Sequence, residues 1–511
     1  AIAFSDTIYV SDKSISDMTG IEAFVNITGL NCSNNDFDTL NINNNTQLKY
    51  MNCRENDLNY LDVSNNILLE KLICQHNLLY SLNVENNIAL VYFDCSINFL
   101  SSLDLNSNTD LKYLDCGENN LNLLNISNNL LLEYLDCRYN HISSLDVTNH
   151  IMLTHIGCGP NNITSLDVSN NTALTFLFCP VIPITSLDLS NNIYLDSLNC
   201  NYTLLTSLDI THNALLRFLA CGKNQFTNLD LSSNTLLRYI SCQESLFSSL
   251  DISNNTLLTY FECQNSSFNN ISFLNNDSLE YLNCNNNNIS QLDLSNNYKL
   301  RELRCGRNNL SNLDVSNNAN IKTLVFNNNH ISSIDLSNNN KINGLWCNGN
   351  QLNELDLTNC DSITNIVCYD NQLEKLYIQN GNNTYIECLL TWNNPNLYCI
   401  QVDDAQWSAS NWTSIDSWTS FSENCHYSID DIDGESALFV FPNPFDDELN
   451  IIFNDIDNHQ IRILDMLGKE WLSAYTKDDK ESLTLTNLPS GTYILQIFSP
   501  DTIRTIKVVR Q

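Results

Sequence analysis

The chain has 511 residues, of which 43% are hydrophobic, and its 58 acidic and 23 basic residues give a formal net charge of −35. Nucleic acid and anionic membrane surfaces repel a protein this negative, so we expect neither as a partner. The sequence contains no run of about 20 apolar residues, the length that a membrane-spanning helix needs, and we predict no transmembrane segment. No signal peptide opens the chain, which predicts that it has been removed or that the protein is cytosolic.

Residues 1–26 are predicted to form an N-terminal cap. The run SDMTGIEAF at 16–24 keeps only part of the spacing that follows it, which is typical of a degenerate first repeat. A repeat array needs such a cap because its core would otherwise be open to water at the end.

Residues 27–390 consist of one unit repeated every 21 residues. The unit can be written LxxLxCxxNxLxxLDVSNNxx, and its cysteine recurs at this interval from Cys32 to Cys305. A fixed period of this length predicts a solenoid, and the unit resembles the leucine-rich repeat pattern LxxLxLxxNxL, with Cys in place of the third leucine. We therefore expect a mainly β fold, with a short parallel strand at each LxC and an extended or β segment at each LDV.

Two features of the unit are predicted to be structural. Parallel strands lie about 4.8 Å apart with their side chains pointing the same way, whereas a disulfide needs Cβ atoms about 3.8 Å apart that face each other. The ladder cysteines are therefore expected to be buried thiols. Asparagines such as Asn56 and Asn66 occupy the two corners, where an amide can bond unpaired backbone groups and where Asn tolerates the left-handed conformation.

The outward positions of the LxC strands are the best candidates for ligand binding. Parallel stacking predicts that aromatic residues three positions before the cysteines form an exposed stripe, which would suit a protein or glycan ligand. An alternative is that these rings only stabilise the strands by packing on one another. The aromatic candidates are Tyr92, Tyr113, Tyr134, Phe176, Tyr239, Tyr260 and Tyr281.

Two further groups lie on the same face. Asp94, Asp115 and Asp136 directly precede cysteines, and three stacked carboxylates repel unless they are solvated or bridged by cations. Calcium is one such cation, but a solvated acidic face is the preferred interpretation, and we predict no metal site. Phe178 joins Phe176 in an apolar patch, which indicates either a partner contact or a local defect of the repeat.

The regular repeat ends before the C-terminus, and three segments follow. Residues 391–425 are rich in Trp and are predicted to cap the array, with a disulfide between Cys399 and Cys425, which bracket the segment. Residues 426–436 are a polar, acidic linker. Residues 437–511 contain alternating apolar and polar runs separated by turn signals, which predicts a small antiparallel β-sandwich.

Two resemblances extend this interpretation. Residues 8–425 resemble the 21-residue leucine-rich repeats of secreted Bacteroidetes proteins. Residues 437–511 resemble the type A C-terminal sorting domain of the type IX secretion system, through FPNPF (441–445), IRILDMLGKE (461–470), LPSGTYILQI (488–497) and KVVR (507–510). The residues that carry this second resemblance include Pro442, Asn443, Pro444, Gly468, Lys469, Gly491, Tyr493, Lys507 and Val508.

The second resemblance implies a destination. It implies export across the outer membrane to the cell surface or beyond, with the type IX translocon, an outer-membrane shuttle protein and a sortase-like peptidase as partners of residues 437–511. The sequence has no phosphate-binding loop, HExxH motif or serine elbow, so we predict neither an enzyme nor a cofactor. The leading hypothesis is a binding or adhesion protein, and the alternative is a structural spacer or surface-coat protein without a specific ligand.

Overall fold

The computed structural model describes residues 4–425, 438–441, 443, 445–453, 458–478, 480–499 and 503–510. The chain divides into two compact units, residues 1–300 and residues 301–511. Within the described residues, no helix is long and apolar enough to span a membrane.

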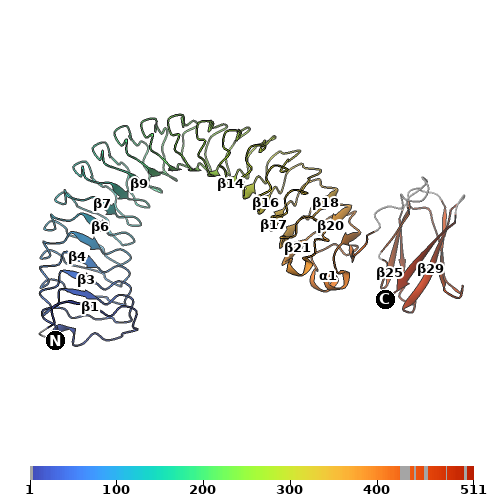
Figure 1. Cartoon of the computed structure of the whole chain (residues 1–511), viewed down its shortest axis with the longest axis horizontal. Helices are drawn as coiled ribbons and strands as arrows, with labels where there is room; N and C mark the ends of the chain where they lie inside the picture. The colour runs from blue at the N-terminus through green and yellow to red at the C-terminus, as the bar shows by residue number, and fades with distance from the viewer. Residues whose placement is uncertain are drawn as a thin grey trace. The chain divides into compact units, whose positions relative to one another are not determined.

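The first unit is a solenoid in which each rung contributes one three-residue strand to a parallel sheet (Figure 1). Neighbouring strands pair in direct register, so that Tyr92 lies opposite Tyr113 and Tyr113 opposite Tyr134. The elements are β1 (Thr7–Tyr9), the 3-10 helix η1 (Ile21–Ala23), β2 (Gly29–Asn31), β3 (Tyr50–Asn52), β4 (Lys71–Ile73), β5 (Tyr92–Asp94), β6 (Tyr113–Asp115), β7 (Tyr134–Asp136), β8 (His155–Gly157), β9 (Phe176–Phe178), β10 (Ser197–Asn199), β11 (Phe218–Ala220), β12 (Tyr239–Ser241), β13 (Tyr260–Glu262) and β14 (Tyr281–Asn283).

The core follows from the alternation of side chains along each strand. In the rung of β6, Leu111, Leu114 and Cys116 are fully buried, whereas Tyr113 and Asp115 point outward. The ladder thiols from Cys32 to Cys263 are free and buried, as the strand spacing predicted. Leucine and cysteine thus build the core, and the residues between them form the outer face of the sheet.

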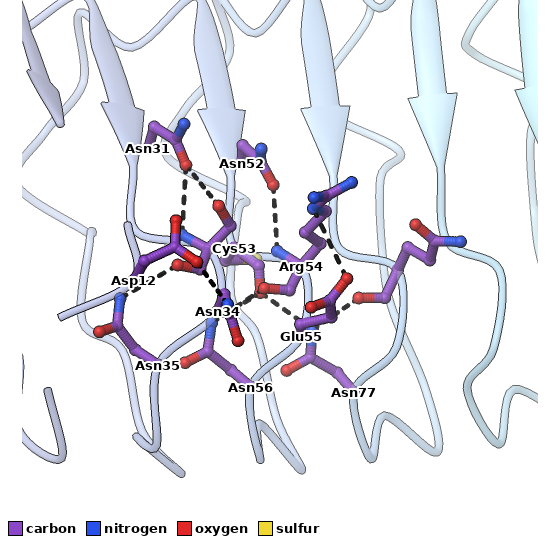
Figure 2. Close-up of polar contacts among 12 residues, drawn as sticks. Asp12, Asn31, Asn34, Asn35, Asn52, Cys53, Arg54, Glu55, Asn56 and Asn77 are labelled. Carbon is purple, nitrogen blue, oxygen red and sulfur yellow. Dashed lines mark hydrogen bonds and ion pairs between the residues drawn. The ribbon is translucent and has the colours of Figure 1, made fainter. Parts of the chain in front are cut away.

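Asparagine amides close the corner that follows most of the strands. Figure 2 shows Asn35, Asn56 and Asn77 in a row beyond the strand ends. Asn56 Nδ2 donates to the carbonyls of Cys32, Cys53 and Arg54 at 3.1, 3.1 and 3.2 Å. Each amide therefore ties its own corner to the preceding rung and satisfies carbonyls that the tight turn leaves without partners.

The corner asparagines do not themselves adopt the left-handed conformation that Asn tolerates. Positive φ falls on the residue just before the corner asparagine, as in Glu55 (φ 54), His76 (φ 55) and Glu118 (φ 51). The corner asparagine supplies hydrogen bonds instead, and the left-handed position accepts many side-chain types because it faces solvent.

A second row of asparagines closes the corner after the LDV segment. Asn66, which is fully buried, donates from Nδ2 to the carbonyls of Ile42 and Asn45 at 3.1 and 2.9 Å. His150 takes this position in one rung, and its Nε2 lies 3.0 Å from the carbonyl oxygen of Ile126. A histidine can replace the amide here because it also places a ring nitrogen within hydrogen-bond distance of that carbonyl.

The second unit begins with further rungs of the same register. A parallel sheet contains β15 (Glu302–Arg304), β16 (Thr323–Val325), β17 (Gly344–Trp346), β19 (Asn365–Val367) and β21 (Cys388–Leu390). A second parallel sheet forms at the LDV side from β18 (Glu354–Asp356), β20 (Lys375–Tyr377), β22 (Cys399–Gln401) and β23 (Ser420–Ser422). The 3-10 helix η2 (Asn383–Tyr385) and the helix α1 (Ala405–Asn411) interrupt the strands.

Residues 391–425, predicted as a cap, contain α1 and a disulfide. Asp404 caps α1 by accepting the N–H of Trp407 at 2.8 Å. Cys399 and Cys425 form a disulfide, with their Cα atoms 5.9 Å apart. The bond joins β22 to the residues that follow β23 and closes a loop of the chain around the helix.

The C-terminal part of the second unit is a sandwich of two antiparallel sheets, as the alternating runs predicted. One sheet contains β24 (Leu438–Phe441), β25 (Glu448–Phe453) and β28 (Lys480–Thr484); the other contains β26 (His459–Asp465), β27 (Glu470–Thr476), β29 (Gly491–Phe498) and β30 (Ile503–Arg510). Leu449 and Ile451 of the first sheet and Ile463 and Leu495 of the second are fully buried in one hydrophobic core. The predicted linker, 426–436, lies outside the described residues.

Candidate binding face

Direct register turns one outward position of each strand into a column of rings, which we call the aromatic column. Tyr92 and Tyr113 stack with ring centroids 4.0 Å apart and planes within 6°, and Tyr113 stacks on Tyr134 at 4.3 Å. The stack continues through His155 to Phe176, at 4.2 and 4.1 Å. A second stack runs through Phe218, Tyr239, Tyr260 and Tyr281, with separations of 4.3, 4.5 and 4.1 Å.

The stacking corrects the expectation that this stripe is exposed. Tyr113 and Tyr134 are half-buried because each ring covers a face of the next. The outer face of Tyr92 is covered as well, since Lys71 Nζ lies 4.0 Å from its ring centroid. Inside the stack, ring edges and phenol hydroxyls are therefore the parts of the column that a ligand can reach.

Beside the column, Asp94, Asp115 and Asp136 lie in register on three adjacent strands. Asp94 and Asp136 are 7% and 1% exposed, so the expectation of a solvated acidic face is wrong. Each carboxylate accepts the backbone N–H two residues further along, at 3.1 Å from Ser96, 3.0 Å from Gly117 and 3.0 Å from Arg138. These bonds end the strands and hold the carboxylates against the sheet.

The environment of this acidic row perturbs several ionisations. Burial, with the neighbouring carboxylates Asp136 and Asp94, raises the pKa of Asp115 to about 7. Burial also raises the pKa of Asp94, against the hydrogen bonds from Ser96. Desolvation lowers the pKa of His155 to about 4 and raises that of Tyr134 to about 12. At neutral pH the Asp115 carboxyl is therefore partly protonated, and the Arg138 guanidinium is paired with Asp136. Among the described residues, no group of three or more His, Cys, Asp or Glu side chains has an arrangement that could hold a metal ion.

The second stack carries its own carboxylate. Tyr260 Oη donates to Glu262 Oε1 at 2.6 Å, and Tyr281 Oη lies 3.5 Å from the same oxygen. Ser241 Oγ donates to the other oxygen, Glu262 Oε2, at 3.2 Å. Tyr260 and Tyr281 were predicted from the sequence, but Glu262 was not. The signal for Glu262 is its place one position before a ladder cysteine, like that of Asp94.

The apolar patch near Phe178 is only partly on the surface. Phe176 and Phe178 are half-buried, with ring centroids 6.3 Å apart, and the Arg138 guanidinium lies 5.1 Å from the Phe178 ring. Val181 and Tyr202 are exposed at the left-handed corner positions. The patch therefore combines two ring edges on the strand face with two exposed side chains at the corner.

Sequence reasoning also missed an apolar stripe on another side of the first unit, which we call the lateral stripe. It follows directly after the buried asparagines of the second corner, at positions where the repeat pattern has only x. Its exposed members are Ile67, Leu68, Ile88, Leu130, Leu131, Ile151, Met152, Ile193, Tyr194, Leu215, Leu257 and Tyr298. A comparison of the two x positions from rung to rung would have found it.

In the sorting domain, the residues of the predicted signal hold the terminal strand in place. Asn443 donates from Nδ2 to the carbonyl of Lys507 and accepts the N–H of Val509, both at 2.8 Å. Tyr493 Oη donates to the carbonyl of Pro489 at 2.6 Å, and the Val508 side chain is fully buried. Pro442 and Pro444 lie outside the described residues.

Two glycines of the signal adopt positive φ, at Gly468 (φ 83) and Gly491 (φ 159). Gly468 lies in the turn between β26 and β27, where Asp465 Oδ1 accepts the N–H of Leu467 and of Lys469 at 2.9 and 3.0 Å. Lys469 Nζ lies 4.1 Å from the Trp471 ring centroid, and Leu467 is 97% exposed at the tip. The turn is thus rigid at its base and apolar at its tip.

Comparison with known proteins identifies both parts of this architecture. Residues 439–511 match the family model of the secretion system C-terminal sorting domain. The functional domain of InlJ from Listeria monocytogenes, which includes a cysteine ladder, is 23% identical, with a TM-score of 0.52 over 100% of this chain and 91% of that one. YopM from Yersinia enterocolitica is 20% identical, with a TM-score of 0.61 over 81% of this chain and 91% of that one.

A plant receptor has the same fold. The leucine-rich repeat ectodomain of the Arabidopsis receptor kinase HAESA, solved in complex with an IDA peptide hormone, is 21% identical, with a TM-score of 0.62 over 78% of this chain and 73% of that one. No curated protein matches the sequence. The fold is therefore a leucine-rich repeat solenoid of 21-residue rungs followed by an antiparallel sandwich. The chain ends in a secretion system C-terminal sorting domain, which marks it for export by type IX secretion to the cell surface or the extracellular space.

Proposed function

We propose that this secreted protein binds a protein or peptide ligand on the strand face of its solenoid. The observation that carries the proposal is the combination of tyrosine hydroxyls with a neighbouring row of buried carboxylates on one rigid sheet. Tyr92, Tyr113 and Tyr134 offer donors and acceptors at fixed spacing, and Asp94 and Asp136 are held by hydrogen bonds that position their charge. A preorganised polar-aromatic face of this kind loses little conformational entropy on binding.

The geometry favours a protein over a glycan as ligand. Sugar rings bind aromatic side chains through the flat ring face, and inside the column these faces are 4.0 to 4.5 Å from the next ring. Ring edges and hydroxyls remain available, and these suit the amides and side chains of a peptide. The HAESA ectodomain, which shares the fold, is bound to a peptide hormone, and this supports the same class of ligand here.

A conservative triple variant tests the strand face. Tyr92→Phe with Tyr113→Phe and Tyr134→Phe keeps the stacked rings and removes only the hydroxyls. Peptide-display, protein-array and glycan-array screens on the full chain would supply ligands, and we expect the triple variant to weaken a peptide or protein hit about tenfold. A matched control on the lateral stripe, Ile88→Ser with Ile151→Ser, should leave the affinity unchanged. Unaltered binding by the tyrosine variant contradicts the site assignment.

We further propose that residues 437–511 are recognised by the type IX translocon, by the outer-membrane shuttle protein and by a sortase-like peptidase. Support comes from the family match and from the ordered signal residues, among them Asn443 and Gly468. Deletion of 437–511 should leave the protein in the periplasm of a host with this secretion system. Undiminished secretion of the truncated chain contradicts this part of the proposal.

A structural spacer is the second candidate, because the stacked rings also stabilise neighbouring rungs. A spacer predicts no specific hit in the screens and a clear loss of thermal stability for Tyr113→Ala. The binding proposal predicts that the screens yield a ligand and that the Tyr→Phe triple variant binds this ligand more weakly. The two candidate functions are therefore distinguished by ligand binding to the unaltered chain and to the triple variant.

A further inference from the structure

The aromatic column is interrupted at one strand. Ser197 of β10 pairs in register with Phe176 on one side and with Phe218 on the other. Phe176 stacks on His155 and Phe218 stacks on Tyr239, so the second face of each phenylalanine is directed toward the rung of Ser197. A small side chain thus occupies the place of one ring, with an aromatic face on either side.

The spacing of the column gives the size of this break. Consecutive rings are 4.0 to 4.5 Å apart along both stacks. Two rung intervals separate Phe176 from Phe218, about 9 Å in total at the usual strand spacing. One flat ring stacked on both phenylalanines fits this distance, since each ring-to-ring contact needs about 4.5 Å.

The break has a charged flank, and its other flank combines an amide with apolar side chains. Ser197 Oγ donates to Asp196 Oδ2 at 3.0 Å, and Asp196 Oδ1 lies 3.1 Å from Arg217 Nη1. On the other flank Asn199 of the same strand lies between Phe178 and Ala220, and its Oδ1 accepts the N–H of Asn201 at 3.0 Å. A ring with one donor at its rim would place its apolar body on the phenylalanines and its donor near the Asp196 carboxylate.

We propose that the break at Ser197 receives one flat aromatic side chain of the protein ligand, a tyrosine or a tryptophan, stacked between Phe176 and Phe218. The inference rests on the proposed function in taking the ligand to be a protein. The phenol O–H or indole N–H of that side chain donates to Asp196. A sugar ring fits less well, because it is puckered and the two close phenylalanine faces suit a planar ring.

Small probes on the full chain test the site without a known ligand. Saturation-transfer NMR would compare N-acetyl-tyrosinamide and N-acetyl-tryptophanamide with N-acetyl-leucinamide and methyl β-glucoside. We expect saturation of the two aromatic probes, and a decrease of about fivefold or more in Ser197→Phe, which fills the break. Thr323→Phe is the matched control: it adds the same ring at the same position of another strand, between Glu302 and Gly344, where an aromatic ring, that of Trp346, lies on one side only.

The folding of the filled variant is checked by thermal unfolding. The added ring stacks on both neighbours, so the midpoint of Ser197→Phe should be at or above that of the unaltered chain. Phe218→Ala, which removes one wall, should also reduce the aromatic signal. Equal saturation of the aromatic probes in Ser197→Phe and the unaltered chain overturns the proposal, as does stronger binding of the glucoside or of the leucine probe at this site. If the chain binds the aromatic probes at Ser197 but the screens find no peptide or protein ligand, the proposed function is contradicted while the aromatic site at Ser197 is supported.

Discussion

Asp136 and Arg138, two residues apart on one rung, form a bidentate ion pair, with Arg138 Nε and Nη2 each 2.7 Å from Asp136 Oδ2 and Nε 2.9 Å from Oδ1. The carboxylate is 1% exposed, so its charge is balanced inside the fold. Asp115, in register on the preceding strand, accepts the N–H of Gly117 at 3.0 Å. Asp136, whose carboxylate is ion-paired, therefore lies beside Asp115, whose carboxylate is repelled by its neighbours. Because this repulsion favours a proton on Asp115, the stability of the solenoid depends on pH.

The first prediction concerns Asp115, whose pKa burial and the adjacent carboxylates raise to about 7. In the unfolded chain an aspartate ionises near pH 4, so between pH 5 and 8 unfolding releases a proton. The contribution of Asp115 to the free energy of unfolding is fully present below about pH 4. It is lost as the pH rises through 7, where the folded carboxyl ionises. We expect the free energy of unfolding to fall by about 2 kcal/mol between pH 5.5 and pH 8 from this group.

The variant Asp115→Asn isolates this contribution. His155, with a pKa lowered to about 4, acts in the opposite direction below about pH 6.5, because its unfolded form binds the proton. The difference between the variant and the unaltered chain cancels that effect. Thermal unfolding at several pH values should show a flatter profile for Asp115→Asn, and an identical slope in both proteins would refute the assignment.

The second prediction concerns thiol reactivity. The ladder cysteines are buried, and desolvation raises the pKa of Cys32, Cys200 and Cys368 to about 12, which suppresses the reactive thiolate. Cys388 is only half-buried. Iodoacetamide should therefore label Cys388 first in the folded protein and the ladder only after unfolding, as followed by mass spectrometry. Early labelling of Cys200 would contradict the burial of the ladder.

The third prediction concerns the corner asparagines. Asn119 Nδ2 donates to the carbonyls of Cys95, Cys116 and Gly117 at 3.1, 3.2 and 3.1 Å, and its Oδ1 accepts the N–H of Leu100 at 2.9 Å. Asn119→Ala leaves these buried groups unpaired, and we expect a loss of about 2–4 kcal/mol in chemical denaturation. The exposed Asn122→Ala should change stability by less than about 0.5 kcal/mol. Similar losses of stability for the two variants would contradict the role of the corner asparagines in joining neighbouring rungs.

The fourth prediction concerns the sorting domain. Asn443 joins the segment before β25 to β30 through the carbonyl of Lys507 and the N–H of Val509. Asn443→Ala breaks both bonds, so we expect easier proteolysis of the terminal strand and a drop in secreted protein of about fivefold or more. Immunoblots of periplasm and medium measure the second effect, with the exposed Lys477→Ala as control. Normal secretion together with increased proteolysis would show that the bonds stabilise the domain without serving export.

The sequence by itself determined the repeat, the parallel strands, the buried thiols and the terminal sandwich. The reason is that a period of 21 residues repeats one local solution many times, so that Leu114, Cys116 and Asn119 have equivalents in most rungs. The order of FPNPF, LGKE and LPSG likewise indicates the sorting domain from the sequence alone.

Only the tertiary structure decided what the outward residues do. Register made Tyr113 half-buried between two rings and withdrew Asp136 from solvent, because a side chain on a stacked rung is shielded by its neighbours in space rather than by its neighbours in sequence. For the same reason the break at Ser197, an ordinary strand residue in the sequence, becomes a distinct place only when Phe176 and Phe218 lie on either side of it.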